Sequence, residues 1–154
     1  MGSRIAASTT AGVIAGLVFG AMMHVMTAPM PGGGEVPVIA MIGQILTGSP
    51  DVTIGWLYHL FNSAVIGAIF GWLLGTRVHG YTSGLGWGAA YGVGWWILGG
   101  LILMPVLLGM PVFAPLTMPE MNVVALGSLA GHLIYGLILG GLYVALFRGA
   151  RVAV

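Results

Sequence analysis

The chain has 154 residues with a formal net charge of +1, and 58% of them are hydrophobic while only 5% are charged. A soluble domain carries roughly 25% charged residues, so this chain has too little polar surface for water and we expect an integral membrane protein. The absence of cysteine excludes disulfides, thiolate metal sites and covalently attached haem. The sequence shows no phosphate-binding loop, no nucleophilic triad and no basic patch for nucleic acid, and it predicts no catalytic set.

Several apolar segments are long enough to cross a bilayer, which takes about 20 residues in an α-helix. In chain order they are residues 7–28, 56–74, 85–108 and 123–147. Because lipid does not tolerate an unpaired backbone, all four are predicted to be helices. Segments 36–49 and 111–122 are too apolar for free loops but too short or proline-broken to span, so we expect re-entrant or interfacial segments at the outer face. The predicted fold class is an all-α four-helix bundle in a single membrane domain, residues 1–154.

The charged residues predict the orientation of this bundle. The arginines precede the first span, separate the second from the third, and follow the fourth; they are Arg4, Arg77, Arg148 and Arg151. The acidic residues Glu35, Asp51 and Glu120 fall in the other two loops. Because loops rich in arginine and lysine stay on the cytoplasmic side, both termini are predicted to be cytoplasmic, with the first and third loops outside.

The two halves of the chain resemble each other. The stretch "HLFNSAVIGAIF" (59–70) aligns with "HLIYGLILGGLY" (132–143), and "PVIA" (37–40) answers "PVFA" (111–114). We therefore predict two tandem hairpin repeats, at about 7–77 and 84–148. Each repeat has an even number of spans, so both copies share one orientation about an axis along the membrane normal. The first residues of the aligned stretches, His59 and His132, are then expected at the same depth.

Small residues follow each of these histidines at four-residue intervals, which places them on the same helix face. Such residues allow membrane helices to approach closely, and they would equally leave room for a macrocycle. We expect these faces to line the bundle interior, with Trp96 of the third span as a further wall. The residues predicted to contact a cofactor are Ser63, Gly67, Gly136, Gly140 and Trp96.

Histidines and methionines gather near the predicted outer ends of the spans, as in "AMMHVMTAPMPGGGE" (21–35). Thioethers select Cu(I), and imidazole suits copper, zinc and iron. We predict a metal centre with His59 and His132 as primary ligands and with His24, Met104 and Met26 as further candidates. It would be haem b or another tetrapyrrole on the paired histidines, or copper on histidine and methionine.

An alternative explains the same residues without a cofactor. Each histidine would hydrogen-bond a backbone carbonyl of an outer segment, and the glycines would serve only helix packing. The protein would then be a structural or assembly subunit of a larger membrane complex or a homo-oligomer. In both cases the expected surroundings are the lipid bilayer and not nucleic acid.

The stretches "YGVGWWILGGLILMPVLLGMP" and "GHLIYGLILGGLY", with the methionine-rich end of the first span, carry a resemblance. They resemble a family of small, uncharacterised prokaryotic membrane proteins with four spans built from two hairpins. The resemblance covers most of the chain. It implies a duplicated fold in a prokaryotic cell membrane, and it implies no activity.

Overall fold

The computed structural model describes residues 2–30 and 33–152. The elements in chain order are α1 (Gly2–Val25), β1 (Thr27–Pro29), β2 (Glu35–Pro37), α2 (Val38–Thr47), α3 (Val52–Leu73), α4 (Tyr81–Trp95), the π-helix η1 (Trp96–Leu103), α5 (Met104–Leu107), α6 (Ala114–Thr117), the 3-10 helix η2 (Pro119–Met121) and α7 (Asn122–Val152). Within the described residues, four helical stretches are long and apolar enough to cross a membrane: Arg4–Val25, Val52–Leu73, Tyr81–Leu107 and Pro119–Phe147. The prediction of an all-α protein with four such helices is confirmed.

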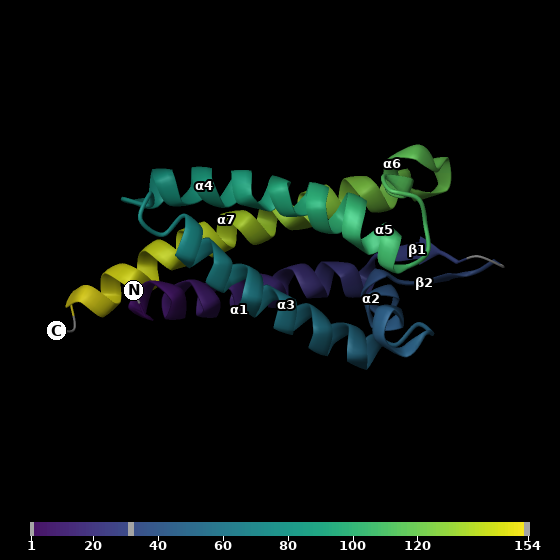
Figure 1. The fold of residues 1–154 in the computed structure, drawn as a ribbon, viewed down its shortest axis with the longest axis horizontal. Coiled ribbons are helices and arrows are strands. Elements are labelled where there is room, and N and C mark those ends of the chain that lie inside the picture. Colours follow the sequence, from purple (N-terminus) through teal and green to yellow (C-terminus); the bar gives the residue numbers. More distant parts are fainter. Residues whose placement is uncertain (1, 31–32, 153–154) are drawn as a thin grey trace.

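The long helices pack as two pairs. α1 packs mainly against α3, α4 packs mainly against α7, and α1 also contacts α7 so that the pairs join (Figure 1). α1 begins and α7 ends at one end of the molecule, whereas β1, β2, α2 and α6 gather at the opposite end. We call these the arginine end, after Arg4 and Arg77, and the hairpin end, after the β1–β2 hairpin.

Glycines let the backbones of each pair touch. A Cβ atom on Gly12 of α1 would lie 2.8 Å from the Cα of Gly67 in α3. In the second pair, a Cβ on Gly88 of α4 would collide with the carbonyl oxygen of Gly136 in α7, and one on Gly84 would lie 2.8 Å from the carbonyl oxygen of Gly140. Contacts this close require residues without side chains, so these positions are helix crossings.

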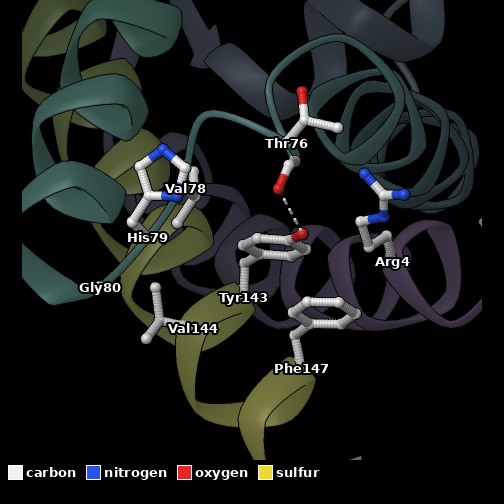
Figure 2. A pocket seen from close by; sticks show the side chains of 9 residues that line it. Arg4, Thr76, Val78, His79, Gly80, Tyr143, Val144 and Phe147 are labelled. Atoms are coloured by element: carbon white, nitrogen blue, oxygen red, sulfur yellow. Dashed lines mark hydrogen bonds between the residues drawn. The ribbon is translucent and has the colours of Figure 1, made fainter. Parts of the chain in front are cut away.

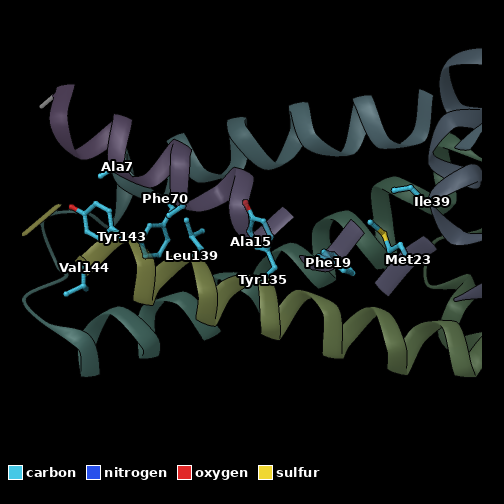
Figure 3. Packing of buried hydrophobic residues seen from close by; sticks show 11 residues of the cluster. Ala7, Ala15, Phe19, Met23, Ile39, Phe70, Tyr135, Leu139, Tyr143 and Val144 are labelled. Atoms are coloured by element: carbon cyan, nitrogen blue, oxygen red, sulfur yellow. The ribbon is translucent and has the colours of Figure 1, made fainter. Parts of the chain in front are cut away.

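A buried cluster runs along the middle of the bundle (Figure 3). Phe19 and Met23 of α1 lie near Ile39 at one end of this cluster, and Phe70 packs near Tyr143 at the other. The outward faces are also apolar: Leu57, Phe61 and Trp72 on α3 are 60% or more exposed. Large exposed apolar surfaces of this kind are unfavourable in water, so the bilayer is the solvent that these faces contact.

The first loop folds differently from expectation, because a β-hairpin follows the first helix. α1 ends at Val25, and β1 pairs antiparallel with β2, Thr27 opposite Pro37. Gly33 and Gly34, with φ of 97° and 84°, adopt the left-handed conformation that glycine permits in the intervening turn. Sequence periodicity did not reveal strands of only three residues.

The helix boundaries also shift at the next span. α3 begins at Val52, earlier than the predicted residue 56, because the Asp51 carboxylate accepts a hydrogen bond from the Ile54 N–H at 2.8 Å. This N-cap satisfies one of the free amides of the first turn. The segment predicted at 36–49 contains β2 and α2, and the segment predicted at 111–122 contains α6 and η2.

The third span is irregular where it approaches the hairpin end. Pro105 lacks the N–H that would bond the Leu101 carbonyl one turn earlier, and the helix widens into the π-helix η1. The returning chain supplies the missing donor, since the Phe113 N–H lies 2.7 Å from the Leu101 oxygen. Phe113 adopts a φ of 61° in doing so, a conformation that is rare for a bulky residue.

Candidate functional site

A groove of about 380 Å³ lies between α3 and the η1–α5 segment, with α1, α2 and α7 behind it. Its volume falls within the range of about 300–1,000 Å³ that is typical of small-molecule sites. Most of the lining is apolar. The polar or aromatic-polar residues that line it are Tyr58, His59, Asn62, Trp95, Ser128, His132 and Tyr135.

His59 reaches the groove from α3 and also hydrogen-bonds the backbone of α1. Its Nε2 lies 2.9 Å from the carbonyl oxygen of Gly16. A carbonyl can only accept a hydrogen bond, so in the neutral ring the proton is on Nε2 and the lone pair is on Nδ1. The imidazole is 8% exposed, and its position is fixed by a bond between two helices.

His132 reaches the same groove from α7 but bonds within its own helix. Its Nδ1 lies 2.8 Å from the Ser128 carbonyl oxygen, one turn earlier. The proton is therefore on Nδ1, and Nε2 carries the lone pair. No residue in the described part of the chain hydrogen-bonds that Nε2, so it is available to a ligand.

Phe19 of α1 contacts both imidazoles. Its ring centroid lies 5.6 Å from that of His59 and 4.8 Å from that of His132, in edge-on geometry. Such T-shaped contacts are favourable between aromatic rings. The two histidines thus share one phenyl neighbour and one groove.

Two thioethers complete the possible donors. Met104 at the start of α5 and Met23 of α1 both line the groove. Among the described residues, no group of three or more His, Cys, Asp or Glu lies close enough to hold a metal ion. Zinc sites are almost always four-coordinate, so zinc in this groove would need donors besides the two imidazoles.

The groove is electrically neutral. No arginine, lysine, aspartate or glutamate is among its lining residues. Since burying an uncompensated charge in apolar surroundings is costly, the groove favours a neutral ligand or a cation of the lowest charge. It also offers no cationic partner for a carboxylate.

The other predicted metal ligands lie outside the groove lining. His24 is exposed, and its Nδ1 accepts a hydrogen bond from the Trp56 Nε1–H at 3.3 Å. Trp56 also packs against His59, so its indole contacts both His24 and His59. Met26 packs against Gly127, where an added Cβ would meet its sulfur at 2.9 Å. Neither His24 nor Met26 lines the groove that His132 reaches.

The residues predicted to contact a cofactor also lie outside the groove lining. Gly67, Gly136 and Gly140 are at the helix crossings, and the buried Ser63 hydroxyl donates to the His59 carbonyl at 2.8 Å. Trp95, and not the predicted Trp96, lines the groove. The indole nitrogen of Trp96 is buried without a hydrogen-bond partner in the described residues. These four small residues therefore lie at helix contacts and not in the groove lining.

Sequence reasoning did not select Phe19 or Tyr135 for the site. Tyr135 lies next to the groove, and its hydroxyl donates to the Ser63 carbonyl across the two helix pairs at 2.9 Å. In an apolar span, the sequence does not distinguish an aromatic residue that lines a groove from one that only packs in the core. Only the position three residues after His132, on the same helix face, pointed towards Tyr135.

Comparisons with known proteins do not supply a function for this groove. No family model matches the chain, and it matches neither a curated protein nor a solved structure. The resemblance to a family of duplicated four-span proteins therefore stays a prediction. The chemistry of His59, His132 and their neighbours carries the functional argument.

Proposed function

We propose that this is a multi-pass membrane protein that holds a metal centre in the groove, on His132 and His59. The observation that carries the proposal is the hydrogen bonding of the two rings. Each imidazole has one nitrogen bonded to a backbone carbonyl, Ser128 or Gly16, which leaves the other nitrogen unprotonated. Histidine ligands of metals almost always have this arrangement, because the second bond fixes the tautomer and the ring orientation.

Copper(I) is the ion that fits this donor set best. Met104 and Met23 line the same groove as the two imidazoles, and thioethers select Cu(I) over harder ions. The lining has no carboxylate, so the ligands are neutral and a singly charged ion costs less to bury than a divalent one. His24 in the last turn of α1 and Met26 just after that helix would be positions through which an ion approaches.

Haem b or another tetrapyrrole is the second candidate, favoured by the apolar walls of the groove. A macrocycle held between both histidines would have to displace Phe19, which contacts each ring. No arginine or lysine lines the groove to pair with propionates. A tetrapyrrole is therefore expected on His132 alone, through the free Nε2.

Metal analysis and an absorption spectrum of the purified protein test the proposal. We expect close to one copper per chain after anaerobic loading with Cu(I), measured against a competing Cu(I) chelator. A Soret band in the protein as isolated would instead identify haem. The absence of both would contradict the proposal and favour a cofactor-free subunit of a larger membrane complex.

We also propose that the two helix pairs are tandem repeats, with both termini cytoplasmic and the segments 36–49 and 111–122 at the outer face. The support comes from matching contacts. The residues four and eight positions after each histidine, Ser63 and Gly67 or Gly136 and Gly140, all face a glycine of the partner helix. The described arginine side chains lie at the arginine end, which the charge rule places in the cytoplasm.

Labelling of single cysteines tests this topology, and the chain has no native cysteine to interfere. A membrane-impermeant thiol reagent added to intact cells should label Gly33→Cys in the hairpin and should not label Tyr81→Cys. Tyr81 at the start of α4 is 53% exposed, so burial would not explain protection. The reverse labelling pattern would invert the proposed orientation.

A further inference from the structure

A second pocket lies at the arginine end, and its lining shares no residue with the histidine groove (Figure 2). It has a volume of about 350 Å³ and is formed by α1, α7 and the loop between α3 and α4. Polar atoms make up most of its lining, in contrast to the groove. The side chains that matter for its chemistry are Arg4, Thr76, Val78, His79, Val144 and Phe147.

Arg4 gives this pocket a positive charge. Within the described residues its guanidinium makes no ion pair, and the acidic residues lie on other elements: Glu35 in β2, Asp51 at the N-cap of α3 and Glu120 in η2. All three of those elements are at or next to the hairpin end. An arginine that faces a polar pocket without a carboxylate is suited to bind an external anion, in particular a phosphate, which matches its planar fork of donors.

The rest of the pocket fits an amphipathic anion. The Tyr143 hydroxyl donates to the Gly75 carbonyl at 3.0 Å and holds the α3–α4 loop against α7 (Figure 2). Val78, Val144 and Phe147 add apolar surface to the lining that includes Arg4. A ligand with a charged head and an apolar body therefore matches the lining better than a free ion does.

We propose that this pocket binds the phosphate head group of an anionic phospholipid. Arg4 would pair with the phosphate, and the apolar side would face the acyl chains. Its position at the end of the membrane-spanning helices is where lipid head groups lie, and basic pockets between helices at that level bind anionic lipids. The site is independent of the histidine groove.

Lipid titration of the purified protein in detergent tests the proposal, with native mass spectrometry to count bound lipids. The probes are phosphatidylglycerol, which is anionic, and phosphatidylcholine, which is zwitterionic. The matched control for Arg4→Gln is Arg77→Gln, because Arg77 is exposed at the same end, lies outside the pocket lining and spends one guanidinium hydrogen bond on the Leu73 carbonyl at 3.0 Å.

We expect Arg4→Gln to weaken phosphatidylglycerol binding by about fivefold or more, as for loss of one cation near a membrane surface. Arg77→Gln should change it by less than about twofold, and Arg4→Lys should fall between wild type and Arg4→Gln, because lysine keeps the charge but loses the fork. Copper content should not change in any of these variants, which separates this test from that of the histidine groove.

Several results would overturn the proposal. Equal losses in Arg4→Gln and Arg77→Gln would mean diffuse surface charge, and equal binding of phosphatidylcholine would mean that the phosphate charge is not recognised. Inorganic phosphate that competes as strongly as the lipid would assign the pocket to a free anion. If Arg4→Gln fails to fold by circular dichroism, Arg4→Lys supplies the test, with weakened phosphatidylglycerol binding as the expected result and wild-type binding as the contradiction.

Discussion

The two helix pairs place matching histidines at the same groove but use them differently. In the first pair, His59 bonds the carbonyl of Gly16 on the neighbouring helix at 2.9 Å. In the second pair, the His132 ring bonds the Ser128 carbonyl of its own helix. The neighbouring helix α4 packs Gly92 closely against the backbone carbonyl of His132 and not against its ring. One histidine therefore holds two helices together, while the other keeps Nε2 free. His59 and His132 occupy aligned positions in the sequence, but their hydrogen bonds differ.

The largest expected effect comes from the glycine crossing of the second pair. Gly88→Ala would place a Cβ against the Gly136 carbonyl oxygen, and because the obstacle is backbone, the helices must separate. Overpacking typically costs about 1–3 kcal/mol, and we expect a loss at the upper end of that range, measured by thermal unfolding in detergent. Gly86→Ala on the same helix is the control, since its Cβ would meet nothing within 4 Å.

Gly12→Ala extends this test to the first pair. Its Cβ would lie 2.8 Å from the Gly67 Cα, so a loss similar to that of Gly88→Ala is expected. A stability change no larger than that of Gly86→Ala at both crossings would show that the helix pairs do not pack as described.

The next effect separates the two histidines in protein without bound metal. His59→Ala removes a hydrogen bond between helices, a contribution of about 0.6 kcal/mol and up to about 1.7 kcal/mol in membrane proteins. His132→Ala should cost less, because the Ser128 carbonyl retains the backbone bond of the α-helix. Unfolding of the two metal-free variants checks the order, and a larger loss for His132→Ala would contradict the assignment of His59 as the residue that bonds the two helices.

A further small effect concerns the contact between the two pairs. Tyr135→Phe removes the hydrogen bond from Tyr135 to the Ser63 carbonyl and keeps the ring beside the groove. We expect a loss of about 0.6 kcal/mol with copper content unchanged. Loss of copper in this variant would mean that the hydroxyl, and not only the ring, belongs to the site.

Composition and hydropathy were sufficient to predict the four long helices, because about 20 apolar residues have few alternatives in lipid. Alignment of the two halves predicted one depth for His59 and His132, and the outer cluster of histidines and methionines gave Met104 as a candidate; all three line the groove. Ser63, Gly67, Gly136 and Gly140 lie at helix contacts and not in the groove lining, because small residues at four-residue spacing are compatible with close packing as well as with a cavity. The hairpin depends on the left-handed conformations of Gly33 and Gly34. The π-helix depends on Pro105, which lacks an N–H, and on the Phe113 N–H that bonds the Leu101 carbonyl instead. Neither feature produces a periodic pattern in the sequence.

Copper binding by single and double histidine variants tests the central claim most directly. If His59 and His132 hold one centre, each single alanine variant should lose most Cu(I) binding, and the double variant should be little worse than either. His79→Ala, at the arginine end, should bind like wild type. Unchanged copper binding in both single variants, with stability losses that add within about 0.5 kcal/mol as for independent sites, would contradict a shared metal centre.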